Sequence, residues 1–171
     1  ALPGLPVVFA LDRAGAVPDD GETHQGIYDV ALFRMMPSLL MLAPCSAAEM
    51  DASLAWALAS GAPAMLRYPK ADCPVGMPSD GEAFVLGRGV LMDSGGTVVK
   101  VGQDPAPAMI VAYGGLVPEA LGAAAMLAAD GIACDICSLR FLKPMDEAWF
   151  LDLSSGREAI LFLEEGVITG G

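Results

Sequence analysis

The sequence has 171 residues, of which 54% are hydrophobic and 18% charged, so its composition is that of a folded globular protein and excludes a disordered one. The formal net charge is −12, which argues against nucleic acid as a partner because phosphate backbones are bound by surfaces rich in Lys and Arg. No apolar run reaches the roughly 20 residues of a membrane helix, and no signal-peptide pattern opens the chain. We therefore expect a cytoplasmic protein that binds neither nucleic acid nor a membrane.

The first half of the chain contains three apolar runs with the length of strands. Residues 6–11 form a continuous apolar run, typical of a strand buried on both faces of a parallel sheet. Residues 39–42 and 64–68 predict two further buried strands, and residues 28–33 predict a short helix. Strands alternating with helices in this way favour a parallel sheet.

A longer helix is expected between the second and third of these strands. Ser46 and Glu49 have the spacing of a capping box, which marks the start of a helix, and Gly61 is a typical C-terminal stop. Its apolar positions recur with helical spacing: Met50, Leu54, Ala57 and Leu58.

A change of composition separates the two halves of the chain. Residues 70–81 are rich in Pro and Gly and lack any periodicity, which is typical of a linker. We place a domain boundary near Gly76, so that residues 1–76 and 77–171 form two units.

The second unit repeats the alternation of the first. Residues 85–92 and 97–101 resemble strands, and the Asp-Ser-Gly-Gly sequence between them predicts a hairpin. The later elements are expected in the order strand, helix, strand, helix, strand, at residues 108–113, 118–131, 134–139, 146–153 and 159–163. The predicted fold class is therefore α/β, with two parallel- or mixed-sheet units.

Two of the four cysteines, Cys134 and Cys137, have the CxxC spacing that metal and redox sites use. They fall within a predicted strand, however, where residues three apart face opposite sides of the sheet. We therefore interpret them as small buried hydrophobic residues, and we expect no metal site in the chain.

The loop after the first strand gathers the side chains best suited to chemistry. It contains Arg13, Asp20 and the only histidine, His24, while Arg67 lies at the end of the third strand. Because the carboxyl ends of parallel strands share one edge of a sheet, Arg13 and Arg67 should converge and clamp a phosphate or carboxylate. His24 can exchange a proton near neutral pH, and Asp20 can orient it or bind a substrate hydroxyl.

These residues also have ordinary structural interpretations. An arginine after a strand often forms a surface ion pair, here with Asp12, and a histidine in a loop often serves packing or capping. Three other arginines have no context that suggests a function: Arg88, Arg140 and Arg157. From composition and spacing alone, the chain is a piece of an α/β enzyme that acts on an anionic substrate.

Motifs along the whole chain resemble the 1-deoxy-D-xylulose-5-phosphate synthase family of transketolase-like thiamine diphosphate enzymes. In the first half they are residues 12–15 (DRAG), 20–26 (DGETHQG) and 67–69 (RYP). In the second half they are residues 87–89 (GRG), 139–146 (LRFLKPMD) and 164–166 (EEG). The resemblance implies part of a pyrimidine-binding domain followed by a C-terminal domain that is truncated at its end.

The resemblance also implies a reaction. Enzymes of this family condense pyruvate with D-glyceraldehyde 3-phosphate, with loss of CO₂, to give 1-deoxy-D-xylulose 5-phosphate, a precursor of isoprenoids, thiamine and pyridoxal. By motif match, Arg13 and Arg67 would hold the acceptor's phosphate, and His24 with Asp20 would contact substrate or assist proton transfer. The implied full-length enzyme is a homodimer that uses thiamine diphosphate and Mg²⁺.

The sequence departs from the family pattern in ways that set further expectations. It lacks the Mg²⁺-binding GDG segment and the glutamate and aromatic residue that act on the aminopyrimidine, and Lys70 stands where arginine is more usual. We therefore expect an internal fragment that neither binds thiamine diphosphate tightly nor turns over alone, and we assign it no cofactor-binding residue. Two alternatives stay open: a subunit of another thiamine-dependent enzyme, such as a 2-oxoacid dehydrogenase β-chain, or a noncatalytic assembly module.

Overall fold

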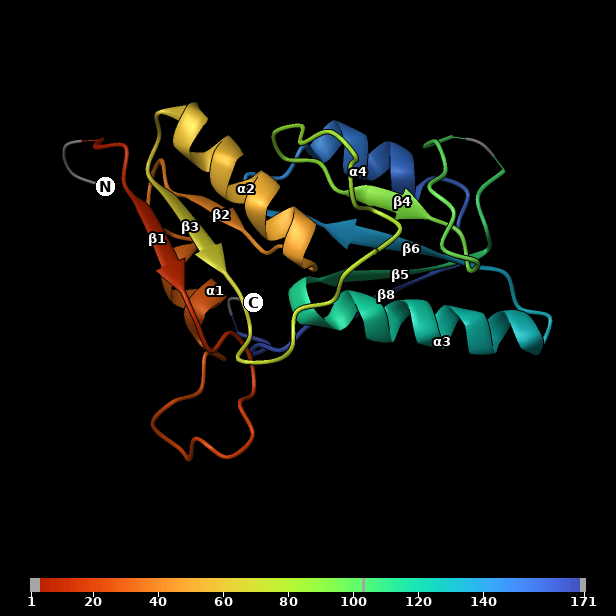
Figure 1. Cartoon of the computed structure of the whole chain (residues 1–171). Helices are drawn as coiled ribbons and strands as arrows, with labels where there is room; N and C mark the ends of the chain where they lie inside the picture. The colour runs from red at the N-terminus through yellow and green to blue at the C-terminus, as the bar shows by residue number, and fades with distance from the viewer. Residues whose placement is uncertain (1–3, 103, 170–171) are drawn as a thin grey trace.

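A computed structural model describes residues 4–102 and 104–169 (Figure 1). Its elements, in chain order, are β1 (Val8–Leu11), α1 (Asp29–Phe33), β2 (Leu40–Leu42), α2 (Ala47–Ser60), β3 (Ala64–Arg67), β4 (Val90–Met92), β5 (Ala108–Tyr113), the 3-10 turn η1 (Gly114–Leu116), α3 (Val117–Ala129), β6 (Cys134–Leu139), β7 (Phe141–Lys143), α4 (Glu147–Ser154) and β8 (Ala159–Leu163). The predicted α/β class is confirmed, and both sheets are mixed.

The first sheet has the strand order β1-β3-β2-β7. β1 and β2 both pair in parallel with β3, as expected of strands joined by helices. One face of this sheet packs against α2 and contributes Leu42 and Leu66 to a core cluster with Ala57. The other face packs toward α1, where Met41 and Met65 join Val30.

The expectation that the first strand is buried on both faces is wrong. β1 lies at the edge of the sheet, and Phe9 is 50% exposed. An edge strand has a hydrogen-bonded neighbour on one side, here β3, so an apolar run is compatible with an exposed strand.

The helix expected after Ser46 is present, and of its four apolar positions Ala57 is buried and Met50 packs against the core. The Ser46 hydroxyl accepts a hydrogen bond from the Glu49 backbone N–H, and Gly61 closes the helix in the left-handed conformation that glycine favours. Leu54 and Leu58 are nevertheless exposed. The buried residues of α2 are Glu49, Ser53 and Ala57, a row of i, i+4 neighbours. A charged and a small polar residue take the buried face because Glu49 has a partner elsewhere in the chain.

A short strand that the sequence did not predict joins the two halves of the chain. β7 comes from the second half and pairs antiparallel with β2 of the first sheet. The Phe141 side chain is 1% exposed and packs edge-on against Trp56 of α2, with ring centroids 4.9 Å apart. The predicted boundary near Gly76 stays a prediction.

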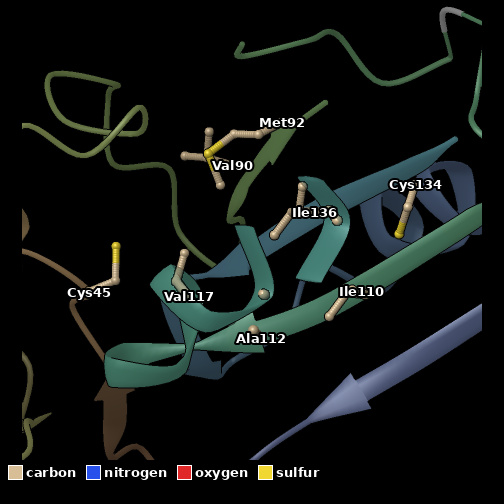
Figure 2. Packing of buried hydrophobic residues seen from close by; sticks show 10 residues of the cluster. Cys45, Val90, Met92, Ile110, Ala112, Val117, Cys134 and Ile136 are labelled. Atoms are coloured by element: carbon tan, nitrogen blue, oxygen red, sulfur yellow. The ribbon is translucent and has the colours of Figure 1, made fainter. Parts of the chain in front are cut away.

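The second sheet has the order β4-β6-β5-β8, with β5 parallel to both β6 and β8. The predicted hairpin is present only in part, because the second piece forms an isolated bridge at Val98, and β4 pairs antiparallel with β6. α3 covers one face and α4 the other (Figure 1). The α3 side of this core is shown in Figure 2, where Val117 packs with Ile110 and Ile136.

The two CxxC cysteines lie on opposite faces of β6, as expected. Cys134 belongs to the cluster under α3, and Cys137 belongs to the cluster under α4. Both thiols are buried, and burial raises the pKa of Cys137 to about 12. The interpretation as small buried residues is therefore confirmed.

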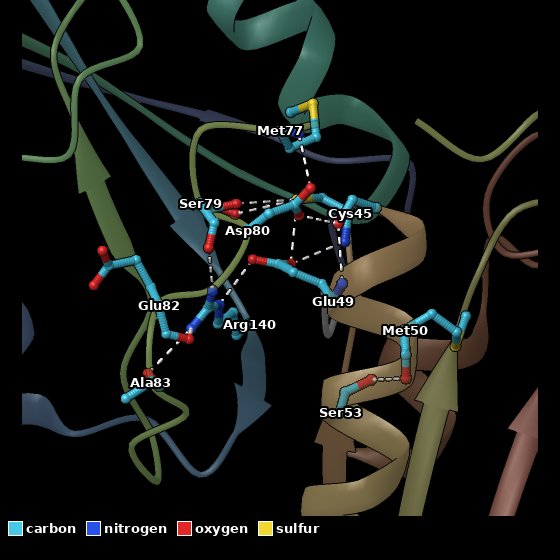
Figure 3. Close-up of polar contacts among 12 residues, drawn as sticks. Cys45, Glu49, Met50, Ser53, Met77, Ser79, Asp80, Glu82, Ala83 and Arg140 are labelled. Atoms are coloured by element: carbon cyan, nitrogen blue, oxygen red, sulfur yellow. Dashed lines mark hydrogen bonds and ion pairs between the residues drawn. The ribbon is translucent and has the colours of Figure 1, made fainter. Parts of the chain in front are cut away.

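A buried ion pair fastens the second half of the chain to α2 (Figure 3). Arg140, between β6 and β7, donates from Nε to Glu49 Oε1 at 2.8 Å, and the two side chains are 2% and 1% exposed. Arg140 also donates to the backbone carbonyls of Ser79, Glu82 and Ala83, so that one guanidinium holds the connecting segment. Sequence reasoning found no role for Arg140, and the side chain proves to be the centre of this junction.

Glu49 completes the same network on its other oxygen. Its Oε2 accepts from the Cys45 backbone N–H at 3.1 Å and from the Cys45 thiol at 3.2 Å. Burial, followed by the charge of Glu49, raises the pKa of the Cys45 thiol to about 12. Cys45 therefore serves as a neutral hydrogen-bond donor in this cluster and not as a thiolate.

Among the helices of the described residues, none is long and apolar enough to cross a membrane.

Candidate functional site

The loop between β1 and α1 leaves the carboxyl end of β1 and is closed at its base by backbone hydrogen bonds (Figure 1). Gly15 N–H donates to Gly26 O at 3.1 Å, and Gly26 N–H donates to Gly15 O at 2.9 Å. Ala14 N–H donates to Tyr68 O at 3.0 Å, which ties the loop to the end of β3. The segment that carries Arg67 is thus fixed against the loop that carries Arg13.

Gln25 braces the interior of this loop. Its side-chain amide donates to Val17 O at 2.9 Å and to Gly21 O at 2.8 Å, while its Oε1 accepts from Val17 N–H at 2.6 Å. In the sequence, Gln25 belongs to the motif of residues 20–26, which does not indicate a role for its side chain. Its position between a histidine and a glycine does not predict that it hydrogen-bonds across the loop.

Arg13 is held by acids of its own loop. Its Nε donates to Asp20 Oδ2 at 2.6 Å, and its guanidinium also pairs with Asp12. Asp20 accepts from Lys70 as well, so the lysine that departs from the family pattern takes part in this cluster. The hydrogen bond from Lys70, followed by the one from Arg13, lowers the pKa of Asp20, which is therefore ionised at neutral pH. The Arg13 backbone has a positive φ of 58°, a conformation that costs a non-glycine residue energy and is common at functional sites.

Arg67, the last residue of β3, is buried, with 3% of its side chain exposed. Its Nη2 donates to Gly26 O at 3.2 Å, and its guanidinium carbon lies 5.4 Å from the centre of the Tyr113 ring. Gly26 packs against the backbone of Arg13, where a Cβ would overlap the Arg13 carbonyl oxygen. Gly26 therefore contacts the backbone of Arg13 and the side chain of Arg67, whereas the Arg13 guanidinium pairs with Asp12 and Asp20, so their convergence on one anion stays a prediction.

The Arg67 guanidinium is not fully satisfied. Its Nε forms an ion pair with Asp29 Oδ2 at 3.6 Å, which is too long for a hydrogen bond, so neither of these buried atoms has a hydrogen-bond partner. Burial raises the pKa of Asp29, and the charge of Arg67 only partly opposes this effect. A buried donor without an acceptor is costly, and a bound anion would supply the acceptor.

The two proposed proton-transfer residues are placed differently from each other. Asp20 faces Arg13 and Lys70. His24 is exposed on the loop, and its Nδ1 lies 2.9 Å from Thr23 Oγ1. The structure thus brings Asp20 to Arg13 and places His24 beside Thr23.

The second unit reaches the same place through the segment that follows β8. Tyr113, at the end of β5, donates from its hydroxyl to Glu164 Oε2 at 3.2 Å. Glu165 lies against Gly15, where a Cβ would overlap the Glu165 side chain. Sequence reasoning read residues 164–166 only as a family motif, because nothing local indicates that they contact the first loop.

Within residues 4–102 and 104–169, no three His, Cys, Asp or Glu side chains are grouped as metal ligands would be.

Comparisons with known proteins place the chain in a family. Residues 1–75 match the transketolase pyrimidine binding domain, and residues 97–171 match the transketolase C-terminal domain. The chain is 44% identical over 171 residues to the 1-deoxy-D-xylulose-5-phosphate synthase of Treponema pallidum, covering 100% of this chain and 26% of that protein. It is 41% identical over 170 residues to the synthase of Thermomicrobium roseum, covering 98% of this chain and 25% of that protein.

Solved structures agree with this placement. A split-gene transketolase in an inactive β4 tetramer superposes with a TM-score of 0.81 at 30% identity, covering 100% of this chain and 52% of that chain. A mutant transketolase from Pichia stipitis in complex with xylulose 5-phosphate gives a TM-score of 0.77 at 28% identity, covering 99% of this chain and 25% of that chain. The chain spans about a quarter of the length of the curated relatives it matches. It belongs to the thiamine diphosphate-dependent transketolase family and is homologous to 1-deoxy-D-xylulose-5-phosphate synthases.

Proposed function

We propose that the chain is the acceptor-binding part of a 1-deoxy-D-xylulose-5-phosphate synthase, which condenses pyruvate with D-glyceraldehyde 3-phosphate and releases CO₂. The observation that carries this proposal is the buried Arg67 Nε, which has no acceptor and lies at the base of the loop that holds Arg13. The phosphate of the acceptor aldehyde would supply the missing oxygen.

Each of the four site residues has a role in this proposal. Arg67 and Arg13 bind the phosphate, and Asp20 keeps Arg13 oriented by accepting from its Nε. His24, exposed on the loop, contacts the substrate or assists proton transfer. In the longer enzyme, thiamine diphosphate with Mg²⁺ would supply the decarboxylation chemistry, and no residue of this chain is assigned to hold either of them.

The proposal includes the expectation that the 171-residue chain is inactive alone and that the full-length enzyme is a homodimer. The resemblance to a split-gene transketolase supports the first of these, because that protein is inactive as a β4 tetramer. Two units divided near Gly76 remain part of the proposal.

A chimera tests the function without knowledge of the rest of the polypeptide. In it, this chain replaces the matching 171 residues of the Treponema pallidum synthase, to which it is 44% identical. We expect the chimera to form 1-deoxy-D-xylulose 5-phosphate from pyruvate and D-glyceraldehyde 3-phosphate, and the chain alone to form none. A folded chimera without product would contradict the proposal and favour a noncatalytic assembly module.

The acceptor distinguishes the synthase from a 2-oxoacid dehydrogenase β-chain. A two-arginine site has a purpose only if the acceptor carries an anion, so the chimera should prefer D-glyceraldehyde 3-phosphate to unphosphorylated D-glyceraldehyde. Equal kcat/KM values for the two aldehydes would show that the two arginines do not bind the phosphate of the acceptor.

A further inference from the structure

Glu165 brings a carboxyl group of the second unit into contact with the loop of the first. The Glu165 side chain packs against Gly15, whose missing Cβ leaves the space that the Glu165 carboxyl occupies. Gly15 also forms one side of the backbone closure with Gly26, which accepts the hydrogen bond from Arg67.

Glu165 and Arg67 are electrostatically coupled. Partial burial raises the pKa of the Glu165 carboxyl, and the positive charge of Arg67 opposes that rise. Burial likewise raises the pKa of Asp29, whose Oδ2 lies 3.6 Å from Arg67 Nε, and the charge of Arg67 opposes that rise. The buried guanidinium of Arg67 therefore forms an ion pair with Asp29 and also acts electrostatically on Glu165.

A phosphate bound at Arg67 would be repelled by both carboxylates, because like charges in a partly buried site repel strongly. Asp29 is fixed at the first position of α1, beside the loop base. Glu165 lies outside any regular element, in the segment that follows β8, and is only half-buried. Of the two acids, Glu165 is the one that can leave when the anion arrives.

We propose that Glu165 is the internal competitor of the phosphate: its carboxylate occupies the Gly15 side of the anion site and must be displaced for a phosphate to bind at Arg67. This inference rests on the proposed function, because it requires a phosphate site at Arg13 and Arg67. It makes the segment after β8 a determinant of acceptor affinity, contributed by the C-terminal domain.

The test is a titration of the 171-residue chain and its variants with inorganic phosphate, followed by calorimetry. Glu165→Gln keeps the shape of the side chain and removes its charge, so it should bind phosphate about tenfold more tightly than the unchanged chain. Glu164→Gln is the matched control. Glu164 accepts a hydrogen bond from the Tyr113 hydroxyl instead of contacting Gly15, so the affinity of this variant for phosphate should equal that of the unchanged chain. Unchanged affinity in Glu165→Gln, or equal tightening in both variants, would overturn the inference.

A second variant separates failure of this inference from failure of the phosphate site itself. Arg13→Gln changes a half-exposed side chain and should not unfold the chain. In the Glu165→Gln background it should weaken phosphate binding, as the proposed clamp requires. If Arg13→Gln leaves the phosphate affinity of the Glu165→Gln variant unchanged, the proposed phosphate site is wrong, and so is the proposed competition. If it weakens binding while Glu165→Gln and the unchanged chain bind equally, the site stands and only the competition is wrong.

Discussion

Replacing Arg140 by methionine should lower the free energy of unfolding by about 3–5 kcal/mol, because it leaves the buried carboxylate of Glu49 without its counter-ion. Arg140 and Glu49 are 2% and 1% exposed, and their Nε–Oε1 distance is 2.8 Å. The same change removes the donors to the carbonyls of Ser79, Glu82 and Ala83, so the connecting segment would lose its anchor. Urea unfolding monitored by circular dichroism measures the effect.

Two further variants show whether the buried charge is the cause. Arg88→Met removes a partner of Asp146 from an exposed ion pair and should leave the unfolding midpoint nearly unchanged. Adding Glu49→Gln to Arg140→Met removes the stranded charge and should recover part of the lost stability. Equal midpoints for Arg140→Met and Arg88→Met would show that the network in Figure 3 does not hold the two halves together.

Replacing Arg67 by methionine in the Treponema chimera should lower kcat/KM for D-glyceraldehyde 3-phosphate by about 100-fold, because a desolvated charge pair with the phosphate is lost. Methionine keeps the apolar stem that packs at the end of β3. Steady-state kinetics with both aldehydes gives the selectivity directly, and kcat/KM for unphosphorylated D-glyceraldehyde should change little.

The matched control for this variant is Arg157→Met. Arg157 is also a buried arginine in an ion pair, with Asp135 at 2.7 Å, but it lies among residues of the second unit. Arg157→Met should therefore affect both aldehydes alike. A parallel loss with both aldehydes in Arg67→Met would assign Arg67 a structural role instead of a role in phosphate binding.

Local chemistry made most of the backbone predictable. The Ser46 cap, the Gly61 stop and the position of Pro118 in the first turn of α3 each act within a few residues, and the helices begin and end where these signals place them. The strands in the middle of both sheets were equally predictable from the sequence, because a continuous apolar run predicts burial on two faces. Phe9 shows where that rule fails, since an edge strand carries the same pattern.

Contacts between distant parts of the chain were not predictable. Glu49 has the pattern of a capping box, yet its carboxyl turns to Arg140 and Cys45, and nothing near it in sequence indicates this choice. β7 is too short to show a period, and it pairs with β2, which lies far from it in the sequence.

The candidate site divides in the same way. The placement of Arg67 at a strand end and of Arg13 in the following loop came from topology, which the sequence pattern reveals. Two residues of the second unit, Tyr113 and Glu165, also lie at this site. The Tyr113 ring packs against Arg67, and Glu165 packs against Gly15. Sequence spacing carries no information about such contacts, and this is why the sequence did not indicate the position of Glu165.

The most direct measurement of the proposed phosphate site is an NMR titration of the chain with inorganic phosphate that follows the arginine Nε–H groups. The Nε of Arg67 is buried without an acceptor, whereas the Nε of Arg140 already donates to Glu49 at 2.8 Å and serves as an internal reference. We expect the Arg67 signal to shift in a saturable way and the Arg140 signal to stay in place. An Arg67 signal that does not move, or one that moves no more than that of Arg140, would contradict a phosphate site at Arg67.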